Sequence, residues 1–155
     1  MARLRMYTAG GMSRSHDRLR IVIDTNVLVA ALTKPSGGAA KVVDACLEGR
    51  LEVVCSEATL QEAELVIDSK WLRRLAPTGR MDSVLKCLRT RSIRVEGALL
   101  KELPLKDEGD RRLVEAAVEG HAAYLVTADQ EVLRYRGYGG TEFVTPAELL
   151  RLLAS

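Results

Sequence analysis

Acidic side chains stand at two places where this 155-residue chain leaves a buried strand. Asp24 directly follows the apolar residues 21–23, and Asp129 comes shortly after the apolar residues 123–126 and Thr127. A carboxylate next to buried residues is unfavourable unless it has a partner or a cation. Asp24 could alternatively cap the next helix, but both positions suit a side chain that a strand delivers into a ligand-binding crevice.

Two further acids are expected on helices that flank these strands. Glu62 borders the apolar stripe of its helix at 100° per residue, whereas Glu64 borders the other side and has the purely structural role in this interpretation. Asp110 projects near the centre of the buried arc of a later helix, although an N-cap would also favour aspartate there. Asp107 and Glu108 are expected to be solvated loop acids.

The two strand acids converge if their strands are neighbours in a doubly wound sheet. Glu62 and Asp110 would then approach from the flanking helices. Several carboxylates within a few ångströms cannot all stay ionised alone, and a divalent cation would relieve their repulsion. An all-oxygen ligand set favours Mg²⁺ or Mn²⁺ over zinc, and such sites hydrolyse phosphodiesters.

The elements that must position these acids alternate between strand and helix from Arg20 onward. We expect strands at 20–23, 51–55, 92–95, 123–126 and 141–144. We expect helices after Asn26 and at 39–49, 57–75, 80–90, 110–119, 129–134 and 146–153, with a loop at 97–109. Strands separated by helices predict right-handed crossovers and a mostly parallel sheet.

Composition places the chain among globular proteins, with 47% hydrophobic and 28% charged residues. No apolar run is long enough for a membrane span, so we expect no membrane association. The three cysteines are dispersed, which favours a reducing, cytoplasmic compartment over a disulfide framework or a zinc site. Residues 1–19 are expected to form a disordered leader, followed by one domain at 20–155.

Positive charge concentrates in residues 70–94, where eight basic residues stand against Asp82 alone. This block predicts a face that binds phosphate groups next to an acid-lined pocket, and the alternative is a solvated pair of helices. The eight residues are Lys70, Arg73, Arg74, Arg80, Lys86, Arg89, Arg91 and Arg94.

Other catalytic motifs are missing from the sequence. It contains no G-x-x-x-x-G-K-[ST], G-x-G-x-x-G or G-x-S-x-G segment, and its two histidines do not form a dyad. The scattered aromatic residues form no RNA-stacking pattern.

Six segments in order give the chain a resemblance to PIN-domain proteins. They are I-V-I-D-T-N-V-L-V-A-A-L, P-S-G-G-A-A, S-E-A-T-L-Q-E-A-E-L-V, D-E-G-D-R-R-L-V-E-A-A, Y-L-V-T-A-D-Q-E-V-L and V-T-P-A-E-L-L. The chain is most similar to the bacterial and archaeal toxin components of type II toxin–antitoxin systems (VapC-like). The resemblance extends from Arg20 to about Leu153.

This resemblance implies a three-layer α/β/α fold with a five-stranded parallel sheet and a metal-dependent endoribonuclease site. Asp24, Asp110 and Asp129 would ligate Mg²⁺ or Mn²⁺, and Glu62 would bind the metal directly or through its water. The same resemblance places supporting polar residues near the site. These are Thr25, Asn26, Ser56, Thr127 and Glu131.

One stretch departs from the family pattern. Residues 107–113 keep Asp110 but lack acids at 109 and 111, and Arg111 is expected to add positive charge, so the resemblance does not imply two metals. It does imply an RNA substrate, an antitoxin partner and a homodimer. Two alternatives remain at this point: a non-catalytic nucleic-acid-binding PIN module, and a phosphatase-type enzyme with Asp24 as nucleophile.

Overall fold

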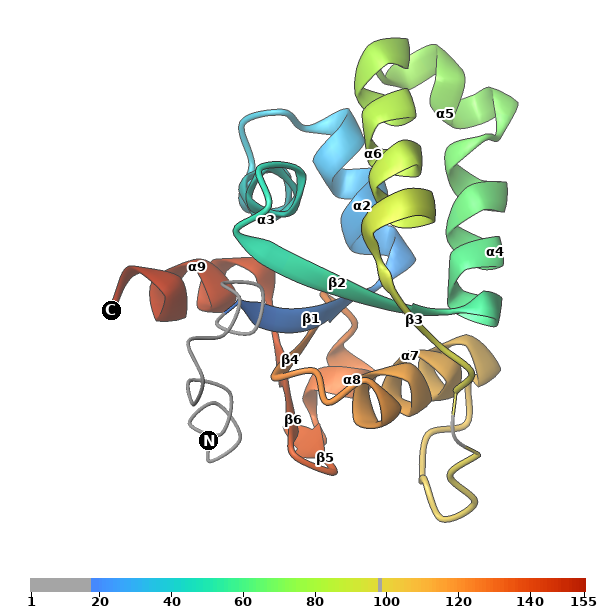
Figure 1. The fold of residues 1–155 in the computed structure, drawn as a ribbon, viewed down its shortest axis with the longest axis vertical. Coiled ribbons are helices and arrows are strands. Elements are labelled where there is room, and N and C mark those ends of the chain that lie inside the picture. The colour runs from blue at the N-terminus through green and yellow to red at the C-terminus, as the bar shows by residue number, and fades with distance from the viewer. Residues whose placement is uncertain (1–17, 98) are drawn as a thin grey trace, which may run out of the picture.

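A computed structural model describes residues 18–97 and 99–155. These residues form a six-stranded sheet of order β3-β2-β1-β4-β6-β5 and the helices around it (Figure 1). The strands are β1 (Leu19–Ile23), β2 (Leu51–Ser56), β3 (Ile93–Val95), β4 (Tyr124–Val126), β5 (Gly137–Tyr138) and β6 (Thr141–Val144). Five of them run parallel as predicted, and β5 pairs antiparallel with β6. The two-residue edge strand β5 was not predicted, because so short a segment carries no periodicity.

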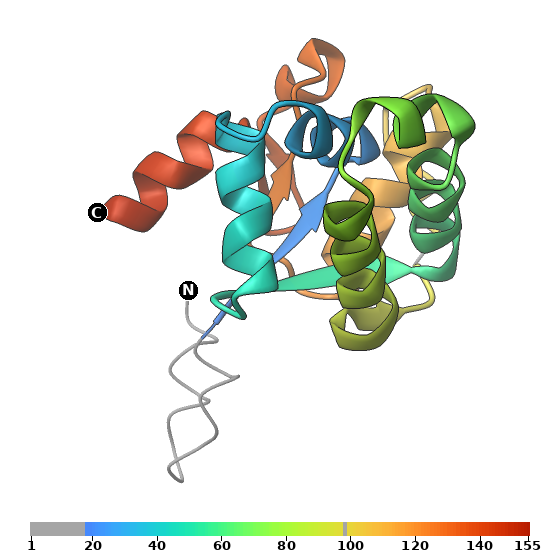
Figure 2. The ribbon, with the colours of Figure 1, turned by 90° about the horizontal axis from the view of Figure 1, so that it is seen from above.

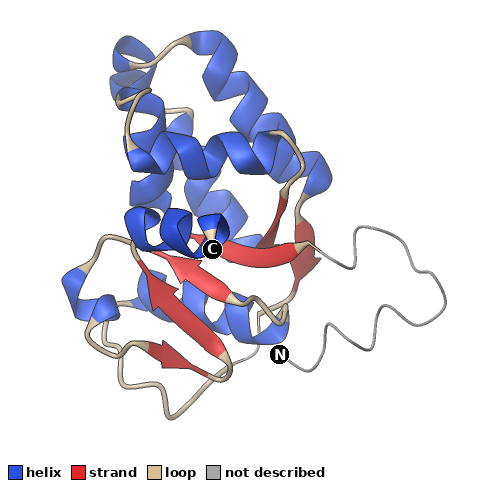
Figure 3. Cartoon of the chain, turned by 90° about the vertical axis from the view of Figure 1, so that its left-hand side faces the viewer, coloured by secondary structure: helices blue, strands red, loops and turns tan. Residues whose placement is uncertain are grey.

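Helices cover both faces of this sheet and make the three predicted layers (Figures 1 and 3). They are α2 (Thr25–Thr33), α3 (Gly38–Leu47), α4 (Glu57–Ile67), α5 (Lys70–Leu75), α6 (Thr78–Arg91), α7 (Glu108–Glu119), α8 (Gln130–Leu133) and α9 (Pro146–Ala154). One layer contains α2 to α6 and α9, with α3 and α9 side by side (Figure 2). The other layer contains α7 and α8.

Alternation along the strands produces two separate cores. Ile21 and Ile23 of β1 pack with the layer of α2 to α6, whereas Val22 between them packs with α7. All three residues are buried, as expected for a central parallel strand that is covered on both faces. Strand β1 pairs in parallel with β4, so the carboxyl ends of these two strands lie side by side. The predicted convergence of Asp24 and Asp129 requires this arrangement.

Several helix boundaries differ from the prediction for local reasons. The predicted helix 57–75 is interrupted, because the Ser69 side chain accepts a hydrogen bond from the Leu72 backbone N–H and starts α5 as a new helix. Helix α6 begins at Thr78, directly after Pro77. Helix α7 begins at Glu108, two residues before the predicted start.

The ends of the chain complete this description. Residues 1–17 of the predicted disordered leader lie outside the described residues, and Leu19 already belongs to β1. Within the part of the chain that is described, no helix has the length and apolar character needed to cross a membrane.

Candidate active site

Asp24 occupies the carboxyl end of the central strand β1 and is held there by both neighbours. Its backbone N–H donates to the Val126 carbonyl (2.9 Å), which continues the β1–β4 pairing. One carboxylate oxygen accepts from the Asn26 backbone N–H (3.2 Å), and the other accepts from the Thr127 hydroxyl (2.8 Å). Asp24 therefore caps α2, as the alternative interpretation proposed, while it is 7% exposed at the predicted strand tip.

Thr127 links the two strand acids. Its fully buried hydroxyl donates to Asp24 and accepts from the backbone N–H of Asp129 (3.0 Å). Asp129 in turn accepts from the Glu131 backbone N–H (2.8 Å) and caps α8. A single hydroxyl thus orients one carboxylate and the loop of the other, which confirms that the ends of β1 and β4 meet.

Asp110 lies in the first turn of α7, but it is not the N-cap of that helix. The cap is Asp107, which is exposed at the end of the loop, as the sequence suggested, and whose side chain accepts from the Asp110 backbone N–H (2.9 Å). Partial burial, followed by the nearby carboxylates of Asp107, Asp129, Asp24 and Glu62, raises the pKa of Asp110 to about 6. The four predicted acids are therefore electrostatic neighbours.

Glu62 approaches Asp110 from α4 through a space that a glycine leaves open. A Cβ atom at Gly109 would lie 3.5 Å from Glu62 Oε1 and 3.1 Å from Asp107 Oδ1. A side chain at position 109 would therefore crowd the Asp107 carboxylate and would be in ordinary contact with that of Glu62. The missing acid at this position, noted above as a departure from the family pattern, leaves a glycine where Glu62 lies beside α7.

A cavity of about 530 Å³ opens beside these acids. Asp110 and Asp129 are among its lining residues, whereas Asp24 lies deeper in the sheet. Among the lining residues that were not predicted as site residues, three have side chains that could bind a charged or aromatic ligand, namely Lys106, Arg134 and Tyr135. A usable indication existed, because each of them lies within six residues of a predicted site acid along the chain.

The supporting residues fall into two groups. Thr25 is buried next to Asp24, Asn26 is exposed, and Glu131 forms an ion pair with Arg134 (2.5 Å) beside the cavity. Ser56, in contrast, is buried and engaged with Thr59 in the N-terminal capping box of α4.

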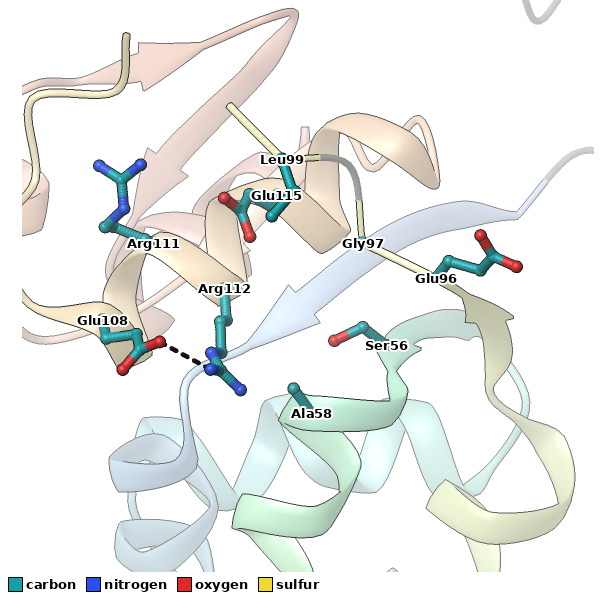
Figure 4. A pocket seen from close by; sticks show the side chains of 9 residues that line it. All are labelled: Ser56, Ala58, Glu96, Gly97, Leu99, Glu108, Arg111, Arg112 and Glu115. Atoms are coloured by element: carbon teal, nitrogen blue, oxygen red, sulfur yellow. Dashed lines mark hydrogen bonds and ion pairs between the residues drawn. The ribbon is translucent and has the colours of Figure 1, made fainter. Parts of the chain in front are cut away.

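Ser56 also lines a second cavity of about 280 Å³ next to α7 (Figure 4). In this cavity Arg112 donates to Glu108 (2.7 Å), so Glu108 is ion-paired and not simply solvated. The remaining lining residues are Ala58, Glu96, Gly97, Leu99, Arg111 and Glu115.

Arg111 does not direct its charge to the four acids, contrary to the expectation from the sequence. Its guanidinium donates to the backbone carbonyls of Leu100 (2.9 Å), Leu103 (2.7 Å) and Leu105 (3.1 Å). Two acids of α7 also bind the loop before this helix. Glu115 accepts from the Leu100 backbone N–H, and Glu119 accepts from the Gly97 backbone N–H. Helix α7 thereby holds the preceding loop at both of its ends.

The donor set fits a hard divalent cation. Among residues 18–97 and 99–155, none of the four acids forms an ion pair with a basic side chain, and no three His, Cys, Asp or Glu side chains are arranged to hold an ion together. Mg²⁺ usually keeps several waters and binds proteins through only one or two carboxylates. Unneutralised carboxylates around a water-accessible cavity suit that mode of binding.

The basic block of residues 70–94 lies on α5, α6 and β3, and most of it is already engaged. Four of its arginines form ion pairs with acids of the chain. The pairs are Arg73–Asp68, Arg80–Asp44, Arg89–Glu64 and Arg94–Glu57. Arg91 donates to the Leu47 carbonyl (2.9 Å). Within the described residues, Lys70, Arg74 and Lys86 have no such partner, and no member of the block lines the cavity beside Asp110.

Comparison with known proteins agrees with this geometry. A family model described as "PIN domain" matches residues 20–131, which include all four acids. An uncharacterized protein of Methanocaldococcus jannaschii is 27% identical over 120 residues, which are 77% of this chain and 76% of that protein. The crystal structure of PAE2754 from Pyrobaculum aerophilum is similar with a TM-score of 0.56 and 19% identity, over 97% of this chain and 96% of that one. The latter similarity concerns the fold alone.

Proposed function

The chain belongs to the PIN domain family, and from this premise we propose that it is a metal-dependent endoribonuclease that cleaves RNA phosphodiester bonds. PIN domains are typically nucleases and generally use divalent metal ions. The observation that carries the proposal is the grouping of Asp24, Glu62, Asp110 and Asp129. Burial is the largest cause of the raised pKa of Asp110, and repulsion from the neighbouring carboxylates raises it further.

The roles of the acids follow from how each is held. Asp24, Asp110 and Asp129 would hold Mg²⁺ or Mn²⁺, directly or through its bound waters, with Asp24 kept in orientation by Thr127. When bound, the cation supplies electrostatic stabilisation of the charge that develops on the phosphate. Glu62 is exposed and lies beside Gly109, so its carboxylate would orient a water molecule and accept its proton during attack on phosphorus.

Contacts to the RNA backbone are proposed for the basic block of residues 70–94. Lys70, Arg74 and Lys86 would contribute most, because an exposed cation without an acidic partner can neutralise a phosphate at no loss of an existing ion pair. Such contacts would position RNA without reading its bases.

We also propose that the protein is the cytoplasmic toxin of a toxin–antitoxin pair and that it forms a homodimer. Exposed apolar side chains on α4 and α5, namely Leu65, Trp71 and Leu75, support a contact with another protein chain. The free thiols of the three buried cysteines are in keeping with a reducing compartment.

Incubation of purified protein with a mixed pool of single-stranded and structured RNA tests the nuclease. The arms are Mn²⁺, Mg²⁺ and EDTA, each with wild type, Asp24→Asn and Glu62→Gln. Glu64→Gln is the matched control, because Glu64 lies on the same helix but pairs with Arg89. Cleavage that requires metal, Asp24 and Glu62 but not Glu64 supports the proposal. RNA binding without cleavage in every arm would instead favour a non-catalytic nucleic-acid-binding module.

Expression in cells tests the toxin role separately. Wild type should arrest growth, and folded Asp24→Asn protein at the same level should not. Growth arrest by the Asp24→Asn chain would contradict a toxicity based on this site.

A further inference from the structure

We propose that Tyr135 is a substrate-positioning residue: the cavity beside Asp110 and Asp129 holds one nucleotide with its base stacked on the Tyr135 ring. This inference rests on the proposed nuclease function and adds a binding residue to the same site. Four observations carry it: the size of the cavity, the backbone contacts of the turn that carries Tyr135, the charges of the lining residues, and the contrast with the other aromatic side chains.

The cavity has the dimensions of a site for one small molecule. Its volume of about 530 Å³ lies within the range of roughly 300–1,000 Å³ that is typical of such sites. One nucleotide fits this space, whereas a base-paired duplex would have to remain outside it. Recognition of RNA through splayed, unpaired bases commonly uses aromatic side chains as stacking surfaces.

Tyr135 presents an aromatic ring from a rigid turn. It is 41% exposed, and the turn that carries it ends in Arg136, which adopts a positive φ of 64°. The Tyr135 carbonyl accepts from the Gly137 N–H (2.7 Å), and the Arg136 carbonyl accepts from Phe143 of β6 (2.8 Å). A Cβ atom at Gly137 would lie 2.6 Å from the Thr141 carbonyl oxygen, so only glycine allows this close approach to β6. Stacking on a ring held in this way requires little additional ordering of the backbone.

The lining of the cavity carries charge of both signs. Asp110 and Asp129 are the lining residues proposed to bind the cation, and Lys106 is a basic lining residue. Lys106 is exposed, and within the described residues it has no acidic partner, so its ammonium group is free for a phosphate oxygen. A nucleotide with its base on Tyr135 could therefore place its phosphate between the cation and Lys106.

Other aromatic residues do not share this position. Trp71 is exposed on α5, in the opposite helical layer, and Phe143 is buried in the core. The sequence contains no stacking pattern because, among the described residues, one aromatic side chain lines this cavity. The same reasoning predicts that substitutions elsewhere on the surface leave base recognition unchanged.

Binding in the absence of metal provides the first test. Fluorescence anisotropy with a labelled single-stranded RNA in EDTA compares wild type, Tyr135→Ala and Tyr135→Phe, with Leu152→Ala on α9 as a control of similar exposure. We expect Tyr135→Ala to weaken binding by about 5- to 150-fold, and Tyr135→Phe to stay within about 2-fold because the ring is retained. A Tyr135→Ala protein that binds like Tyr135→Phe would overturn the inference.

An RNA series with one abasic nucleotide at successive positions provides the second test. One abasic position should weaken wild-type binding and should have no further effect in Tyr135→Ala, since the same contact is already lost. A duplex of the same sequence should bind both proteins equally. Additive losses at every position would overturn the inference.

Cleavage in Mn²⁺ separates this inference from the proposed function. If wild type cleaves RNA and Tyr135→Ala shows an unchanged KM, the stacking role fails while the nuclease stands. If wild type neither binds nor cleaves any RNA, the proposed function itself fails and the stacking role fails with it.

Discussion

The acidic edge of the sheet and the basic helices α5 and α6 differ in whether their charged side chains form ion pairs. At the edge, four carboxylates lie close together without a basic partner among the described residues, inside a frame of hydrogen bonds from Thr127 and Asn26. In the helical layer, most arginines are neutralised by acids of the same chain. Charge left unneutralised indicates a site for a ligand, whereas paired charge chiefly stabilises the fold. A function can therefore be assigned to a charged residue only when its partners in the fold are known.

The largest expected effect concerns the acid at the end of β1. Asp24→Asn should lower metal-dependent cleavage by about 100-fold or more, because a carboxylate that is held by two hydrogen bonds is replaced by a neutral amide. The measurement is the initial rate in Mn²⁺, with circular dichroism to verify folding. A rate within a few-fold of wild type would show that the acidic edge is not the catalytic region.

Gly109→Ala should separate activity from stability. The new methyl group would lie 3.1 Å from Asp107 Oδ1 and shift this carboxylate, which accepts a hydrogen bond from the Asp110 backbone N–H, so we expect about a 10-fold loss of cleavage. The thermal midpoint should not fall in proportion, because alanine favours a helix by roughly 1 kcal/mol over glycine. Gly79→Ala is the matched control, since Gly79 lies in the first turn of α6 with no atom within 4 Å of the added group. Equal activities of the two variants would contradict the role assigned to Gly109.

Asp110→Asn should make the metal-free protein more stable at neutral pH. The pKa of Asp110 is raised from 3.8 to about 6 in the folded state, so the folded state binds the proton more tightly than the unfolded state. Stability from this group is therefore present below pH 3.8, falls as pH rises toward 6, and is fully lost above it.

Replacing Asp110 by asparagine removes this loss of stability at neutral pH. We expect a gain of about 1 kcal/mol at pH 7 in EDTA, a value reduced for the partial solvent exposure of the carboxyl, and a smaller gain at pH 4. Thermal melts at the two pH values measure it, and added Mg²⁺ should raise the midpoint of wild type more than that of the variant. A gain that is equal at both pH values would argue against repulsion as its cause.

The smallest expected effect compares two basic residues of α6. Lys86→Ala should weaken RNA binding about 3-fold and reduce the salt dependence by roughly one phosphate contact. Arg89→Ala should change binding less, because its guanidinium already pairs with Glu64 (2.6 Å). Binding titrations over a range of salt concentrations measure both variants. A larger loss for Arg89→Ala would reverse the distinction between paired and unpaired charge.

Much of the fold could be predicted because it depends on local patterns. The apolar run that ends in Asp24 and the similar run before Thr127 predicted neighbouring strand tips, and the β1–β4 pairing confirms this. The break at Ser69 and the edge strand β5 could not be predicted, because each depends on one or two residues whose conformation is fixed by tertiary contacts.

The candidate site was predicted less completely than the fold. Two acids were predicted from their position after strands and two from helix periodicity, but Arg111 was expected to add positive charge near them, whereas it holds the loop before α7. Tyr135 and Lys106 lie within six residues of a predicted acid, but the fold is needed to bring the segment of Lys106 and Asp110 together with that of Asp129 and Tyr135 in one cavity. Side chains with long-range backbone partners leave no periodic pattern in the sequence.

Part of the loop between β3 and α7 is held to the helix by that set of contacts. The backbone N–H groups of Gly97 and Leu100 donate to Glu119 and Glu115 of α7, so opening of the helix should also release these two amide hydrogens for exchange with solvent. Residues outside any regular element would then report the opening of a helix.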